Sequence, residues 1–144
     1  MKRLKKVFQL SPQELWLLLQ AAALLLTVHL ALKFTTVARL QRIGATGESA
    51  AVAGGLSPQT ISRLVRIAAE HGPYRAMCLE QSLVLHWLLQ RQGIDARILF
   101  GLRKEDNRTE AHAWVEVDQM SFDEDDEMHR RFSPFEELAA LKKN

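Results

Sequence analysis

The spacing of apolar residues predicts a helical first half and a mixed second half for this chain. Ser11-Pro12-Gln13-Glu14 is a capping-box sequence with proline at the first helical position, so it predicts the start of a helix whose apolar part is Leu15–Leu32. A short helix is expected over Val37–Ile43, and the Gly-, Ala-, Ser- and Thr-rich residues 44–55 are a candidate linker. Ser57-Pro58 starts a further helix with an apolar stripe.

Another amphipathic helix is predicted between Pro73 and Gly93. Its apolar positions recur at the spacing of one helical face, and they are Leu79, Leu83, Val84, Trp87 and Leu88. Gly93 supplies the left-handed stop expected at a helix end. Pro73 shortly precedes the only cysteine, so Cys78 is expected in the first turn. The free N–H groups and the positive dipole end at that place favour a thiolate and could hold an oxyanion.

Strands are predicted after this helix. Residues 96–102 alternate as in a half-buried strand, and Arg103–Glu110 is expected to be a charged connection because it contains no apolar residue. The next strand divides its side chains between two faces, with Ala113, Val115 and Val117 on one and His112, Trp114 and Glu116 on the other. A tight turn near Asp118-Gln119 or Gln119-Met120 leads to a third strand. The pattern predicts an α+β fold, with helices packed on one side of a small antiparallel sheet.

A thiol, an imidazole and carboxylates follow one another along this second half. After a hairpin loop of two or four residues, odd positions share the face of His112, which favours Asp123 as the group that orients the imidazole. Asp125 is a close rival, and a bulge in the hairpin would favour Glu124 instead. The candidate catalytic residues are therefore Cys78 as nucleophile, His112 as base and Asp123 as orienting group.

Each of these residues also has an ordinary structural interpretation. A lone cysteine in a helix is more often a buried core residue than a nucleophile, and His112 could be a structural histidine. The acidic run Asp123–Glu127 could be a solvated turn, which is the usual meaning of a charge cluster. A zinc site is a weak alternative because the chain has no C-x-x-C or H-x-x-x-H pair. We therefore expect no metal and no cofactor.

The motifs of the second half resemble those of a known enzyme family. Four segments carry this resemblance, namely Cys78-Leu-x-x-Ser-Leu, Leu-Leu-x-Arg-x-Gly93, Phe100-Gly-Leu and Ala111-His-Ala-Trp-Val-Glu-Val. They are similar to motifs of the transglutaminase-like cysteine peptidases of lasso-peptide biosynthesis. Leu10-Ser11-Pro12 matches the start of a helix that is frequent in the family. The resemblance covers most of the chain, most specifically residues 78–117. It implies a transglutaminase/papain-like core in which the nucleophile is Cys78, the base is His112 and the third member is an aspartate after the hairpin.

The resemblance implies a hydrolase that removes the leader from a ribosomally made lasso-peptide precursor. No alternating strand pattern precedes residue 57, so the chain resembles the peptidase half alone. This implies a separate leader-binding protein and an ATP-dependent macrocyclase as partners, and exposed parts of Leu15–Leu32 are a candidate docking surface. Two other function classes stay open. One is a transglutaminase-like acyl transferase on the same residues, and the other is a non-catalytic peptide-binding or scaffold module.

Length, net charge and the N-terminal helix bear on domain organisation, partners and cellular location. The 144 residues suffice for one compact unit, with an N-terminal helical region over residues 1–56 and a peptidase core over residues 57–144. The net charge of +2 gives no electrostatic reason to expect nucleic acid, and a single cysteine suits the reducing cytoplasm. Basic residues before an apolar run also occur in signal peptides and membrane anchors. A buried or partner-covered Leu15–Leu32 is favoured over membrane contact, since polar residues interrupt the run.

Overall fold

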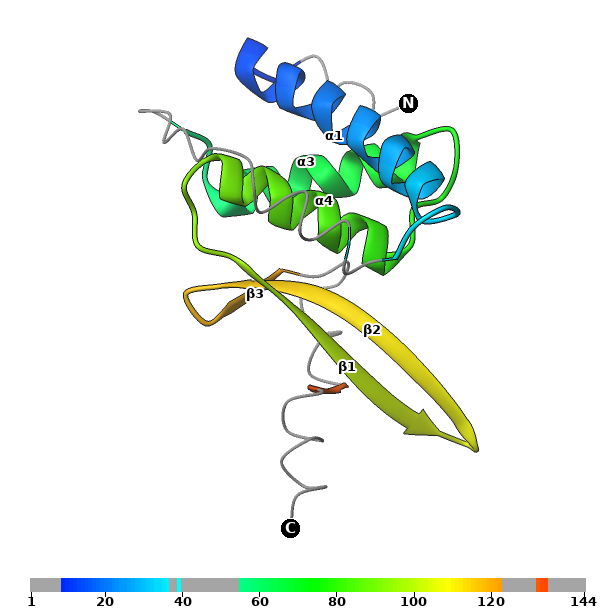
Figure 1. The fold of residues 1–144 in the computed structure, drawn as a ribbon. Coiled ribbons are helices and arrows are strands. Elements are labelled where there is room, and N and C mark those ends of the chain that lie inside the picture. Colours follow the sequence, from blue (N-terminus) through cyan, green and yellow to red (C-terminus); the bar gives the residue numbers. More distant parts are fainter. Residues whose placement is uncertain (1–8, 37–38, 40–54, 123–131, 135–144) are drawn as a thin grey trace.

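The computed structural model describes residues 9–36, 39, 55–122 and 132–134 (Figure 1). Within these residues, helices form one layer and an antiparallel sheet forms the other, which is the predicted α+β arrangement. The helices are α1 (Pro12–Ala31), α3 (Pro58–His71) and α4 (Cys78–Arg91). The strands are β1 (Arg97–Glu105), β2 (Arg108–Val117), β3 (Met120–Phe122) and β4 (Ser133–Pro134). They lie in the order β3-β2-β1-β4, with α4 against β1 and β2.

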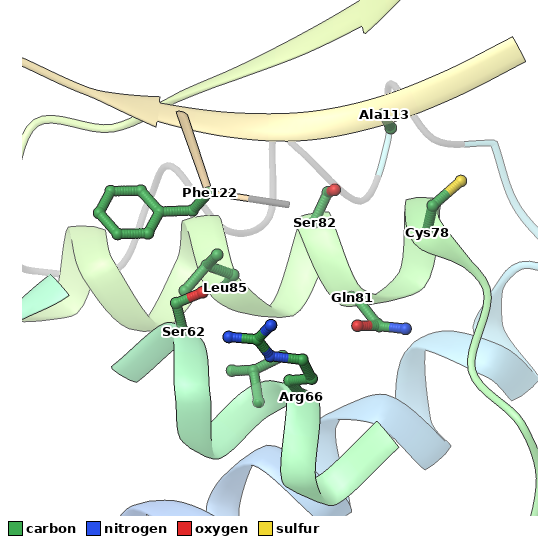
Figure 2. A pocket seen from close by; sticks show the side chains of 9 residues that line it. Ser62, Arg66, Cys78, Gln81, Ser82, Leu85, Ala113 and Phe122 are labelled. Atoms are coloured by element: carbon green, nitrogen blue, oxygen red, sulfur yellow. The ribbon is translucent and has the colours of Figure 1, made fainter. Parts of the chain in front are cut away.

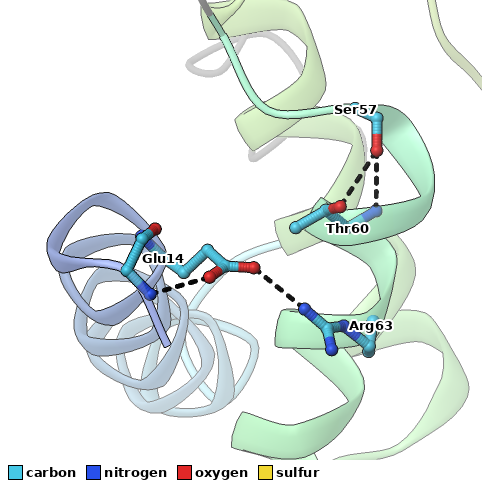
Figure 3. Close-up of polar contacts among 5 residues, drawn as sticks. Glu14, Ser57, Thr60 and Arg63 are labelled. Carbon is cyan, nitrogen blue, oxygen red and sulfur yellow. Dashed lines mark hydrogen bonds and ion pairs between the residues drawn. The ribbon is translucent and has the colours of Figure 1, made fainter. Parts of the chain in front are cut away.

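Serine caps set the starts of α1 and α3, as the sequence predicted. Ser11 Oγ accepts the N–H of Glu14 at 3.2 Å, while the Glu14 carboxylate accepts the N–H of Ser11 at 2.8 Å. Ser57 Oγ accepts the N–H of Thr60 at 3.2 Å. Figure 3 shows the second cap beside the ion pair of Glu14 with Arg63, 2.9 Å long, which connects α1 to α3. The two caps show that these helix boundaries are encoded locally.

The core lies between the helices and the inner face of the sheet. Its largest fully buried side chains come from α3, α4 and β2, and they are Ile61, Leu64, Val84, Leu89 and Val115. The helix α1 adds a single line of buried residues at i, i+4 spacing, namely Leu17, Ala21 and Leu25. Burying a leucine, isoleucine or valine side chain contributes about 1.5–3 kcal/mol to the free energy of unfolding. The three helices are therefore held as one packed layer on the sheet.

The hairpin of β1 and β2 is longer than the sequence indicated. Arg103–Glu110 was expected as a connection, but Glu105 pairs with Arg108 across the ladder. The turn is only Asp106-Asn107, with φ angles of 45° and 66°, a left-handed conformation that Asp and Asn tolerate. The expectation was wrong because backbone hydrogen bonds carry strand pairing, so an exposed hairpin end needs no apolar side chains.

The hairpin of β2 and β3 confirms one of the two predicted turns. Asp118-Gln119 forms a two-residue turn with φ angles of 48° and 67°, and Val115 pairs with Phe122. On the other edge of the sheet, Ser133–Pro134 pairs with β1 as the short strand β4, which the sequence did not indicate. Ser133-Pro134-Phe135-Glu136 is also a capping-box sequence that predicts a short helix through Leu141, and residues 135–141 lie outside the described residues.

The helix α1 is packed on one side only. Its inner side contacts α3 and α4, which confirms burial for that side, whereas large apolar side chains on its outer side are exposed. Among the described residues, one helix, Pro12–Ala31, is both long enough and apolar enough to cross a membrane.

Several expectations concern residues that the structure does not describe. The acidic run Asp123–Glu127 lies outside the described residues, as do nearly all of the expected helix Val37–Ile43 and of the linker 44–55. The division at residue 56 into a helical region and a peptidase core stays a prediction.

Candidate active site

The first turn of α4 holds Cys78, as predicted. Met77 is the N-cap residue with extended backbone angles, and Cys78 is the first helical residue. The Glu80 carboxylate accepts the N–H of Met77 at 2.9 Å, and Gln81 Nε2 donates to the carbonyl of Ala76 at 3.0 Å. Cys78 is half-buried rather than sealed in the core. The thiol therefore lies at the positive end of a helix whose entry is held by two side chains.

A buried polar cluster ties this first turn to α1. Glu80 is 6% exposed, and its second carboxylate oxygen lies 2.7 Å from Nδ1 of His29. The rings of His29 and Tyr74 are 4.1 Å apart, and the Tyr74 hydroxyl donates to the carbonyl of Leu25. Burial, together with the nearby charge of Glu80, raises the pKa of Tyr74 to about 12. This cluster fixes the orientation of the helix start that bears Cys78.

A small, partly open pocket lies beside Cys78 (Figure 2). It is formed by α3, α4 and the hairpin of β2 and β3, and its lining residues are Ser62, Val65, Arg66, Cys78, Gln81, Ser82, Leu85, Ala113 and Phe122. Figure 2 shows the Cys78 side chain at the end of α4 that lies next to Ala113 of β2. Ala113, the residue after His112, therefore lines the same pocket as the predicted nucleophile, with its side chain on the opposite face of β2 from that of His112.

His112 is buried in β2, 5% exposed. Its ring stacks against Phe132, with ring centroids 5.0 Å apart, and against Trp114 at 6.0 Å. Trp114 shares its face, as the alternation predicted, and the cross-strand partner of His112 is Gly101. A Cβ atom on Gly101 would lie 2.8 Å from Phe132 Cβ and 2.9 Å from the Trp114 ring. The absence of a side chain at Gly101 thus allows two aromatic rings to pack around the imidazole.

The third candidate lies just beyond the described part of the chain. Asp123, Glu124 and Asp125 are all outside the described residues, so the choice among them stays a prediction. The described register pairs Glu116 with Ser121, an even residue with an odd one. This is the parity on which the preference for odd positions was based.

Other titratable groups give no sign of a second centre in the described chain. No group of three or more His, Cys, Asp or Glu side chains that could hold a metal ion occurs among the described residues. His86 lies farther along α4, where burial lowers its pKa, opposed by a hydrogen bond to the backbone of Ala96 and by the charge of Asp95. Its place beside the apolar stripe of α4 favours a structural role for His86 over a catalytic one.

Sequence reasoning missed several polar residues around Cys78. Gln81 and Ser82 follow Cys78 by three and four positions, so helical spacing alone places them on the same face. Arg66 and His29 come from other helices, and no pattern in the sequence connects them with the site. Only helix packing brings them there.

The described fold thus combines a thiol at the start of a helix with a buried histidine on a strand that packs against this helix. The family model described as the transglutaminase-like superfamily matches residues 22–137, and the chain belongs to this superfamily. Its members are typically catalytic, as cysteine peptidases or acyl transferases. Searches among curated proteins and among solved structures gave no match.

Proposed function

We propose that this protein is a cysteine peptidase that removes the leader from a ribosomally made lasso-peptide precursor. The single observation that carries the proposal is the position of Cys78 as first residue of α4, beside the strand that holds His112. The motifs around both residues resemble leader peptidases of this kind, and they lie within the part of the chain that matches the superfamily. The proposed triad is Cys78, His112 and Asp123, with Glu124 and Asp125 as alternatives.

The proposed reaction has two steps. His112 takes the proton of the Cys78 thiol, and the sulfur attacks the carbonyl carbon of the scissile peptide bond. Backbone N–H groups at the start of α4 stabilise the negative oxygen of the tetrahedral intermediate. The intermediate collapses when His112 protonates the leaving amine, which departs as the core peptide with a free N-terminus. Water, deprotonated by His112, then hydrolyses the thioester, so the leader leaves as a carboxylate and the thiol is restored.

The aspartate in this mechanism orients and stabilises the imidazole without taking its proton. The aromatic rings of Trp114 and Phe132 exclude water from one side of the imidazole. A small pocket such as that beside Cys78 would accept only a short stretch of substrate. We therefore propose that most of the leader is held elsewhere, by a separate leader-binding protein in the cytoplasm. An ATP-dependent macrocyclase would then use the released core peptide.

The decisive experiment combines precursor, leader-binding protein and this enzyme, and measures the products by mass spectrometry. We expect cleavage by the wild type and its loss in Cys78→Ala and His112→Ala. His71→Ala is the matched control, because His71 is an exposed histidine at the end of α3 and its replacement should leave cleavage unchanged. Asp123→Asn, Glu124→Gln and Asp125→Asn, compared in parallel, identify the third member by the largest loss of kcat.

The outcomes separate the function classes. An added amine that appears as an amide on the leader, in place of the hydrolysis product, would favour the acyl transferase. Undiminished function of Cys78→Ala would favour a binding module and overturn the proposal. Because Cys78 is the only cysteine, loss of cleavage after alkylation of the wild type gives an independent test on a chain with no substitution.

A further inference from the structure

The outer side of α1 carries a continuous line of exposed apolar residues. Its members are Leu15, Trp16, Leu19, Leu26 and Leu30, which are 42–64% exposed, and we refer to them as the outer stripe. They recur at the spacing of one helical face over a helix about 30 Å long. Phe34, 88% exposed, follows just beyond the helix end. So many large apolar side chains together on one surface indicate an interaction site.

The opposite side of α1 is held in the protein core. Leu17, Ala21 and Leu25 pack against α3 and α4, and His29 contacts the buried carboxylate of Glu80. A helix that spans a bilayer would have to release all of these contacts. The geometry instead suits a helix that lies flat on a surface, with its inner side in the protein and its outer side in contact with something apolar.

The charge of the chain is distributed very unevenly around this helix. Residues 1–47 contain seven Lys and Arg and a single acidic residue, a net charge of +6. Since the whole chain carries +2, the remaining residues carry −4. Four of the seven cations, Lys2, Arg3, Lys5 and Lys6, precede the helix, and Lys33 follows it. The one acid, Glu14, is paired with Arg63. The apolar stripe is thus flanked along the chain by positive charge at both ends.

We propose that the outer stripe of α1 binds the surface of an anionic lipid bilayer. The leucines would enter the boundary between headgroups and acyl chains, and Trp16 would take the interfacial position that this amphipathic ring prefers. The flanking Lys and Arg side chains would contact anionic headgroups. Both apolar burial and charge are required, because either one alone gives weak and reversible binding. This inference does not depend on the proposed peptidase activity.

Vesicle sedimentation of the full chain tests the proposal. We expect binding to vesicles of phosphatidylcholine mixed with phosphatidylglycerol, little binding to phosphatidylcholine alone, and weaker binding as salt screens the charges. The double variant Lys5→Gln/Lys6→Gln should lose about fivefold in affinity for each lysine removed. Leu19→Glu/Leu26→Glu should lose at least about tenfold. Thr109→Glu/Gln119→Glu is its control, because it adds the same charge at two exposed positions away from α1, one near the start of β2 and one in the turn after it, and should lose far less.

The measurement also distinguishes other occupants of the stripe. Binding that is equal on both kinds of vesicle, or absent from both, would overturn the proposal. A dimer in solution that Leu19→Glu/Leu26→Glu dissociates would also overturn the proposal. The same holds if a leader-binding protein binds the wild type but not this variant, and vesicles bind neither. A readout that needs no charged substitution is tryptophan emission, whose shift on anionic vesicles should disappear in Trp16→Phe, and persistence of the full shift would contradict the proposed orientation.

Discussion

Replacement of Gly101 by alanine tests how the imidazole of His112 is held. The new Cβ would meet Phe132 Cβ at 2.8 Å and two atoms of the Trp114 ring at 2.9 Å. Ordinary carbon contacts lie at about 3.5–4.0 Å, so each of the two aromatic residues must move away from the new Cβ by roughly 0.6–1.2 Å. Backbone strain does not contribute, because the φ angle of Gly101 is not positive; among the described glycines, Gly93 has a positive φ. The effect of the substitution is therefore steric.

Such overpacking costs about 1–3 kcal/mol of unfolding free energy, since Trp114 is held in β2 and Phe132 directly precedes β4. For a chain of this length, each kcal/mol lowers Tm by about 3 °C. Both rings contact His112, so their displacement also moves the imidazole. If the peptidase mechanism is correct, cleavage should fall by about tenfold or more, because misplacement of a catalytic group by about 1 Å can cost this much.

Urea unfolding gives the free energy, and the precursor cleavage assay gives kcat and KM. Ala111→Val is the control, because it adds methyl groups to an exposed position on the same strand and should change stability by less than about 0.5 kcal/mol. A Gly101→Ala variant as stable and active as the wild type would refute the packing of Phe132 and Trp114 over Gly101.

Three further predictions concern titratable groups in the helical layer, of which Glu80 is buried and Tyr74 and His86 are half-buried. Tyr74 is the only tyrosine, so tyrosinate absorbance should report one titration near pH 12, and a midpoint near 10 would contradict its burial. Because the unfolded chain loses this proton first, the free energy of unfolding should fall as pH rises through that window. The lowered pKa of His86 makes the free energy of unfolding change with pH in the opposite direction. The unfolded chain binds its proton more readily, so acidification below about pH 6.5 should destabilise the wild type more than His86→Gln, as urea unfolding at two pH values will show. Glu80→Ala removes the acceptor for the N–H of Met77 and the partner of His29, so it should cost about 1–3 kcal/mol, and Glu80→Gln should recover part of this loss. Equal unfolding curves for Glu80→Ala and the wild type would show that the buried cluster does not stabilise the fold.

Local sequence signals determined most of the secondary structure and the place of Cys78 at the start of a helix. Ser11 and Ser57 cap their helices, Gly93 adopts the left-handed conformation that ends α4, and Cys78 lies in the first helical turn. The alternation around His112 also gave the correct faces of β2. These features depend on backbone geometry within a few residues, which neighbouring side chains encode directly.

Contacts between distant segments were decided only by the tertiary structure. No sequence pattern placed His29 on Glu80, Phe132 on His112, or Ser133–Pro134 beside β1. The near-uniform apolar pattern of α1 likewise did not indicate which side would be buried. Each of these outcomes depends on which surfaces meet when helices and strands pack together. That choice follows from the shape and burial of the whole chain, and residues adjacent in sequence do not encode it.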